Sequence, residues 1–274
     1  MRRLFLLLPL CCVLAPEGLP RADDPGRGGP AKLAKVADDG KALPSAAGME
    51  RLARADPVAF LEDCLKRYDR EVKGYTATMQ KQERLRGKLQ RTEVIEVAFR
   101  EKPFSVRMEW KQGERKAKRL VYVEGENDNQ LLVLPAGLAG FVGVVARDPA
   151  GPEVRESSRY PPTEFGIKVG MQKALGAWRA ARKRGELRVR FLGEQKVKEA
   201  GGRACWVLER TGYKKPDEEG VNYSKFYFDK ETWLQVGTLL KGEGGKLIGE
   251  YFFRDVRLNP KLDPDAFTRE GLKK

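Results

Sequence analysis

The fold is decided by a stretch that begins Tyr75-Thr76-Ala77-Thr78-Met79-Gln80-Lys81-Gln82-Glu83-Arg84-Leu85. Four further short runs of β-favouring residues follow it, at 89–100, 104–110, 120–123 and 130–134. Tight connections separate the runs, at Gly87, Pro103, Gly113 and Gly125. Because no helical crossover fits between consecutive runs, we expect the strands to be antiparallel.

Helical patterns stand on both sides of these strands. Asp56-Pro57 is typical of a helix start, and apolar residues then recur at helical spacing as far as Gly74. A second helix is expected after Pro161-Pro162-Thr163, with Trp178 on its apolar face. Strands then resume at 187–191, 204–211, 223–228, 233–240 and 246–256.

This order of elements predicts an α+β fold. We expect one large, curled antiparallel sheet that does not close, with the two main helices packed on its concave side. A twisted sheet of about ten strands tends to curl, which leaves a concave apolar face. Residues 56–274 are expected to form this single domain.

The N-terminal segment differs from the rest in composition. Met1-Arg2-Arg3 and the apolar run 4–15 are typical of a secretory signal, which we assign to residues 1–22, with an uncleaved anchor as the alternative. Residues 23–55 are rich in Pro, Gly, Ala and charged residues and lack aromatic residues. They are therefore predicted to be a flexible linker.

Composition excludes several classes of function. The 274 residues carry 53 Lys and Arg against 39 Asp and Glu, a formal charge of +14, and no histidine. Without an imidazole there is no Ser-His-Asp or Cys-His nucleophile and no His-bearing metal site. Phosphate-loop, dinucleotide and paired-cysteine motifs are also missing. We therefore expect no enzyme activity, no metal site and no cofactor.

Two features leave alternatives open. Cys64 and Cys205 are predicted either to form a disulfide, which export favours, or to be two small buried apolar residues. The Gly-rich stretch 136–145 fits either a mobile flap or an ordinary strand with glycine bulges.

The end of the second helix is basic, with Arg179, Arg182, Lys183 and Arg184. Nucleic acid is not an expected partner of an exported protein. Anionic lipid headgroups of a membrane surface or acidic envelope polymers suit these cations better, and a solvated helix face explains them equally well.

Several segments resemble a bacterial family called domain of unknown function 1571. They are 75–78, 99–110, 122–125, 227–232 and 253–259. The family is similar in turn to the LolA and LolB lipoprotein carriers, so the resemblance implies an unclosed barrel with helices in its mouth. The carriers have a basic residue before a proline and then an aromatic residue near an arginine. Lys102-Pro103 and Arg107 to Trp110 occupy that pattern here, with Lys102 in place of the usual arginine.

We therefore predict a non-catalytic binding or carrier protein of the periplasm or cell envelope, monomeric, whose partner is a lipid or acylated protein. The residues expected to contact the ligand are Leu61, Leu65, Lys102, Pro103, Met108, Trp110, Tyr122, Phe141, Val142 and Trp178. The alternative is an envelope interaction module with a filled interior, whose basic face binds acidic polymer or a partner protein.

Overall fold

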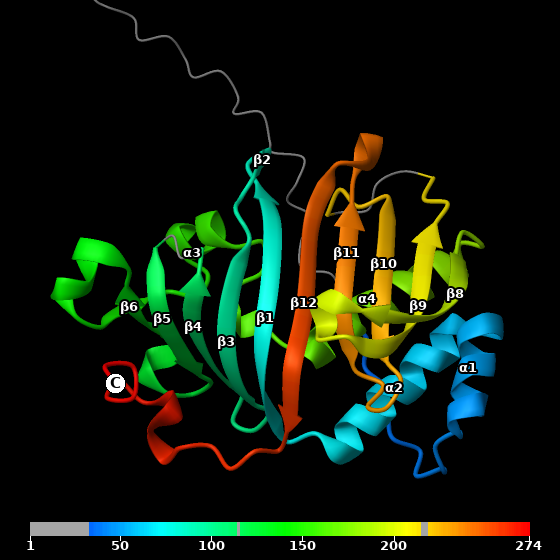
Figure 1. Cartoon of the computed structure of the whole chain (residues 1–274), viewed down its shortest axis with the longest axis horizontal. Coiled ribbons are helices and arrows are strands. Elements are labelled where there is room, and N and C mark those ends of the chain that lie inside the picture. The colour runs from blue at the N-terminus through cyan, green and yellow to red at the C-terminus, as the bar shows by residue number, and fades with distance from the viewer. Residues whose placement is uncertain (1–32, 114–115, 215–218) are drawn as a thin grey trace, which may run out of the picture.

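A single antiparallel sheet of 12 strands dominates the chain (Figure 1). The computed structural model describes residues 33–113, 116–214 and 219–274. The strands are β1 (Gly74–Leu85), β2 (Lys88–Leu89), β3 (Glu93–Arg100), β4 (Ser105–Gln112), β5 (Ala117–Val123), β6 (Leu131–Pro135), β7 (Val145–Arg147), β8 (Arg188–Val197), β9 (Arg203–Thr211), β10 (Tyr223–Asp229), β11 (Gln235–Lys241) and β12 (Leu247–Leu258). The helices are α1 (Ala46–Ala55), α2 (Pro57–Glu71), α3 (Pro152–Ser157) and α4 (Ile167–Lys183).

The sheet consists of two meanders joined in the middle. Its order is β7-β6-β5-β4-β3-β1-β12-β11-β10-β9-β8, and the short β2 pairs only with β1. The central pair joins the first strand to the last, with Tyr75 opposite Leu258. Since β7 and β8 are the two edges of this order, the sheet does not close, and the predicted fold class is confirmed.

Both long helices pack on the same face of the sheet. Asp56 caps α2 by accepting hydrogen bonds from the backbone of Val58 and Ala59. The Phe60 ring of α2 lies 5.0 Å from Phe228 of β10, and the Trp178 ring of α4 lies 5.3 Å from Phe226 of the same strand. Phe226 and Phe228 are two residues apart, so their side chains share one face.

The predicted linker, residues 23–55, extends too far toward the C-terminus, because its last ten residues form a helix. Residues 46–55 form helix α1, capped by Ser45, and Met49 and Ala53 are buried in the main core. The Pro- and Gly-rich composition applies to the residues before this helix, whereas Met49, Leu52 and Ala53 supply an apolar stripe. The signal at 1–22 and residues 23–32 of the linker lie outside the described residues.

Three further expectations can be compared with the structure. Cys64 and Cys205 are both free and buried, so the structure has the small apolar residues rather than the disulfide. Pro162–Glu164 forms its own 3-10 turn, and α4 begins only after Gly166. The stretch 136–145 is not a regular strand, because Gly137–Val142 forms the 3-10 turn η2.

The C-terminal segment covers part of the opposite face of the sheet, at β4 to β6. Phe267 and Leu272 pack there against Val121, Val123 and Leu132 in a second, smaller core. Within the described residues, no helix combines the length and the hydropathy that crossing a bilayer requires.

Candidate ligand-binding groove

A groove of about 1,820 Å³ lies between the concave face of the sheet and the segments that cover it. Side chains of β1, β4 to β6 and β9 to β12 form its floor. Its other wall comes from α3, α4 and the residues that connect them, 158–166, which we call the crossing segment. Much of the lining is apolar, as in Met79, Leu120, Val133 and Phe253. The groove therefore lies on the concave apolar face that the curled sheet is expected to have.

Several residues of α4 that line the groove are small. Gly170, Ala174 and Ala177 lie at helical spacing and line the groove. A Cβ atom at Gly170 would lie 3.4 Å from the Gln235 amide nitrogen, so even one methyl group would narrow the space. The small side chains keep α4 on the sheet without filling the space beside it.

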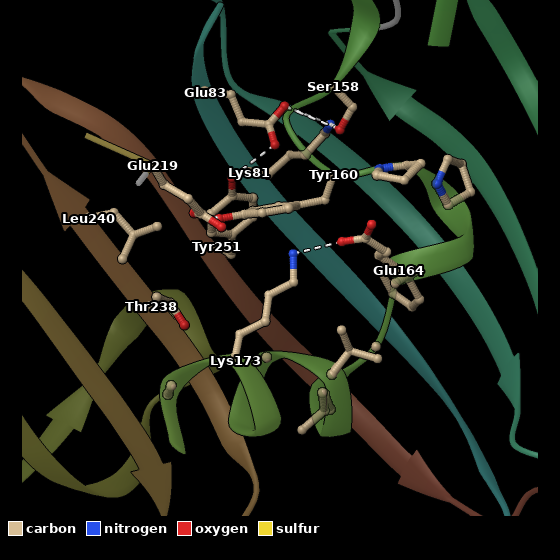
Figure 2. Close-up of a pocket in the computed structure, with 18 of the residues that line it drawn as sticks. Lys81, Glu83, Ser158, Tyr160, Glu164, Lys173, Glu219, Thr238, Leu240 and Tyr251 are labelled. Carbon is tan, nitrogen blue, oxygen red and sulfur yellow. Dashed lines mark hydrogen bonds and ion pairs between the residues drawn. The ribbon is translucent and has the colours of Figure 1, made fainter. Parts of the chain in front are cut away.

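A buried cluster of charged groups lies at one end of the floor (Figure 2). Lys81 of β1 is opposite Glu93 of β3 and Tyr251 of β12. Its ammonium group lies 3.2 Å from a Glu83 carboxylate oxygen, 3.7 Å from Glu93 and 3.3 Å from the Ser158 hydroxyl. The Tyr251 hydroxyl donates to the other Glu83 oxygen at 2.9 Å. Both Lys81 and Glu83 are buried, at 6% and 3% exposure.

The ionisation of Glu83 reflects this environment. Burial alone would raise its pKa, but the Lys81 ammonium and the Tyr251 hydroxyl outweigh burial and hold the pKa below its usual range. Burial, together with the charge of Glu83, raises the pKa of Tyr251 well above its usual range. Glu83 is therefore a carboxylate and Tyr251 a neutral hydroxyl at neutral pH.

The crossing segment is fastened to both the sheet and α4. Its Tyr160 hydroxyl donates to Glu219, and the Tyr160 ring lies 6.0 Å from that of Tyr251. Lys173 of α4 lies 3.7 Å from the centre of the Tyr160 ring and pairs with Glu164 at 2.8 Å (Figure 2). These contacts place polar and charged groups in the groove beside its apolar lining.

Two buried polar atoms in the groove wall have no hydrogen-bond partner among the described residues. They are the indole nitrogen of Trp178 and the amide oxygen of Gln235. Trp178 is fully buried and Gln235 is 5% exposed, and both line the groove. An unpaired buried polar group costs about 1–3 kcal/mol. A ligand group that both donates and accepts hydrogen bonds has the chemistry to satisfy either atom.

The predicted ligand-contacting residues are only partly brought together. Met108, Trp110 and Trp178 line the groove. The other seven do not. Leu61 and Leu65 are buried in the core, and Tyr122 packs beside Phe104. Lys102 and Pro103 lie exposed in the turn between β3 and β4.

Phe141 and Val142 are also absent from the groove wall and are among the most exposed apolar side chains, at 89% and 76%. They project from η2 into solvent. The residues that sequence reasoning missed include Lys81, Glu83, Tyr160, Glu219 and Tyr251. Only the first two carried a signal, because they continue the alternation of Tyr75, Ala77 and Met79 along the inward face of β1.

The four cations at the end of α4 are mostly engaged within the protein. Arg179 pairs with Glu62 at 2.8 Å, Arg182 with Asp56, and Arg184 with Glu186 at 2.7 Å. These pairs favour the solvated helix face over a dedicated anion-binding surface. Over 33–113, 116–214 and 219–274, no three His, Cys, Asp or Glu side chains gather closely enough to hold a metal ion.

A family model described as "Protein of unknown function (DUF1571)" matches residues 72–271, which is most of the chain. The chain belongs to this family. No protein of curated function matches the sequence.

Several solved structures share a similar arrangement at low sequence identity. MucB is 17% identical with a TM-score of 0.48, and the match covers 78% of this chain and 63% of that one. A LolA superfamily protein from Nitrosomonas europaea is 8% identical with a TM-score of 0.32, covering 77% of this chain and 98% of that one. The lipoprotein LppX of Mycobacterium tuberculosis is 8% identical with a TM-score of 0.37, covering 76% and 100%. This chain thus spans less than two thirds of the MucB chain.

Proposed function

We propose that this protein is an exported, non-catalytic binding or carrier protein of the bacterial cell envelope. Its groove would hold the apolar chain of a lipid or of a lipidated partner. The observation that carries the proposal is the groove of about 1,820 Å³ on the concave face. That volume exceeds the roughly 300–1,000 Å³ typical of small-molecule pockets.

The energetics of such a groove favour a ligand. Each methylene group of an acyl chain that leaves water for an apolar site contributes about 0.8 kcal/mol. A chain long enough to follow the groove would therefore bind without any charged contact. The unpaired Trp178 and Gln235 atoms add a second reason for occupancy, since a bound polar group would remove their cost.

The interaction module with a filled interior is less well supported. The groove is open rather than filled, and three of the four cations that would form its basic face are already paired with acids of the same chain. Export remains part of the proposal, based on the signal expected at residues 1–22.

The proposal is tested by titrating delipidated protein with a fluorescent fatty acid. Wild-type protein should bind it, and Ala177→Phe should weaken binding by roughly tenfold or more, equivalent to about 1.4 kcal/mol, because the new ring enters the groove. Gln172→Phe is the matched control, since Gln172 lies on the same helix outside the groove lining.

Mass spectrometry of organic extracts from natively purified protein supplies the second readout. An acyl-chain compound that disappears from the Ala177→Phe protein and remains with Gln172→Phe supports the groove as its site. If delipidated wild type binds no fatty acid and native protein carries no lipid, the carrier proposal is wrong.

A further inference from the structure

The turn η2 exposes three large apolar side chains at one edge of the sheet. Leu138, Phe141 and Val142 are 85%, 89% and 76% exposed. We call these three residues the apolar tip. Exposure on this scale costs free energy in water, because apolar surface favours removal from it. A contiguous group of such residues on a short turn marks a contact surface.

The surrounding sequence is uncharged over a long distance. The run Leu131 to Ala146 contains sixteen residues without a single Asp, Glu, Lys or Arg, in a chain of which 34% is charged. Gly143 closes the turn with φ of 79°, a left-handed conformation that a residue with a side chain rarely adopts. The chain therefore turns back sharply after the apolar tip, and the tip stays exposed to solvent.

The base of the turn is connected to the groove. Pro135, Ala139 and Val145 flank or belong to η2, and all three line the groove. The segment that carries the apolar tip therefore also contributes to the wall of the groove.

Basic residues stand around this base. Lys116 accepts a backbone hydrogen bond from Ala136, Arg147 belongs to β7, and Arg269 donates to the Val144 carbonyl at 2.9 Å. Lys116 and Arg147 also pair with Glu156 and Glu153. All three cations remain exposed despite these contacts, and exposed cations beside an apolar tip match the arrangement of a bilayer, in which anionic headgroups lie above the acyl chains.

We infer that the apolar tip, which adjoins the groove wall, inserts into the surface of an anionic lipid bilayer. The inference rests on the proposed function, because it names the surface from which the groove would receive its ligand or to which it would deliver it. A protein partner suits the tip less well, since three side chains offer far less than the roughly 800 Å² per partner of a standard protein interface. Reversible bilayer contact needs only a small apolar area together with nearby cations.

The main experiment is vesicle flotation of the full chain. Wild-type protein should float with vesicles of phosphatidylcholine and phosphatidylglycerol, and less with phosphatidylcholine alone. The triple variant Leu138→Ser, Phe141→Ser, Val142→Ser should partition at least about tenfold less, since three exposed apolar side chains are lost. Leu89→Ser is the matched control, because Leu89 is also exposed and apolar but lies in the β1–β2 hairpin.

A second variant reports insertion directly. Phe141→Trp should show a blue shift of its added fluorescence with phosphatidylglycerol vesicles and quenching by brominated acyl chains, and Leu89→Trp should show neither. The inference is overturned if wild type ignores both vesicle types, or if the triple variant floats like wild type. It is also overturned if the triple substitution changes only the oligomeric state, which would assign the tip to a second copy of this chain.

Fatty-acid titration in solution separates this inference from the proposed function. The triple variant should bind fluorescent fatty acid like wild type, because the tip does not line the groove. If wild-type protein binds fatty acid but no vesicles, the proposed membrane contact of the apolar tip is wrong and the proposed ligand site in the groove stands. If wild-type protein binds vesicles but no fatty acid, the proposed ligand site in the groove is wrong instead.

Discussion

Helices α2 and α4 both pack on the concave face of the sheet. The face is filled with side chains under α2, whereas the groove lies beside α4. α2 presents Phe60, Leu61, Leu65 and Tyr68, all at most 1% exposed, and none of them borders the groove. α4 also buries large side chains such as Trp178, but its small residues Gly170, Ala174 and Ala177 line the groove beside it. The size of the helical side chains therefore contributes to whether the face of the sheet is filled.

The two regions are also held together by different forces. Under α2, aromatic rings pack edge to face, with Phe60 5.8 Å from Trp206 and 5.0 Å from Phe228. Trp178 of α4 also packs edge to face, on Phe226, but the groove beside α4 has in addition the ion pair and hydroxyl contact of Lys81 and Glu83. Substitutions that remove side-chain volume should therefore destabilise the filled region most. Substitutions that remove a charge should destabilise the hollow region most.

The largest effect is expected in the filled region. Phe60→Ala should lower the free energy of unfolding by about 3–5 kcal/mol, because it leaves a cavity in a tightly packed aromatic cluster. Urea denaturation of full-length protein measures the loss. Leu138→Ala, at an exposed position, should change it by less than about 0.5 kcal/mol. A Phe60→Ala loss below 1 kcal/mol would show that this region is not filled as described.

The hollow region is tested by removing its buried cation. Lys81→Met should destabilise the protein by about 3 kcal/mol, because Glu83 and Glu93 would lose a buried positive partner. The exposed Lys111, which pairs with Glu96 and Glu109, provides the control, and Lys111→Met should cost less than about 1 kcal/mol. Equal losses at the two lysines would contradict a special role for the buried cluster.

Acid should weaken the hollow region selectively. The folded pKa of Glu83 lies below its ordinary value, so Glu83 stabilises the fold above about pH 4.3 and loses that contribution as the pH falls through its folded pKa. The urea midpoint of wild type should fall between pH 6 and pH 3, and more steeply than that of Glu83→Gln. Parallel curves would mean that Glu83 titrates alike in the folded and unfolded chain.

The smallest effects are expected where the two helices meet. Asp56 caps α2 and also pairs with Arg182 of α4. Asp56→Ala should cost about 1 kcal/mol through the lost cap, whereas Arg182→Ala should cost less than about 0.5 kcal/mol because the pair is exposed. Thermal unfolding of the two variants measures both. A larger loss of stability for Arg182→Ala than for Asp56→Ala would show that the ion pair contributes more than the helix cap.

Much of the architecture follows from local pattern. Alternation along 75–85 and the glycine or proline breaks predicted an antiparallel sheet, since these signals act between neighbouring residues. Helix α1 was missed because its short apolar stripe, Met49 to Ala53, follows a segment whose composition is typical of linkers. Its burial depends on β8 and β9, more than 130 residues away in the sequence.

The site was harder to predict than the fold. Leu61 and Leu65 lie on an apolar helix face, as predicted. The spacing of apolar residues, however, does not show whether such a face packs in the core or lines a groove. Phe141 and Val142 are expected to contact the ligand at the cavity or its mouth, but they project into solvent, because apolar character alone does not show which way a side chain points. Tyr160, Glu219 and Tyr251 come from three distant segments, and only the folded sheet brings them together.

The central pairing of β1 with β12 has a consequence for biogenesis. Each meander can assemble from neighbouring hairpins, but the seam between them joins residues about 180 positions apart, such as Tyr75 and Leu258. Contacts of this sequence separation form slowly, and β12 is synthesised after every other strand of the sheet. The two halves therefore stay unjoined, with open edges, until β12 has been synthesised. A chaperone that shields β1 during that interval would raise the yield of correctly assembled molecules.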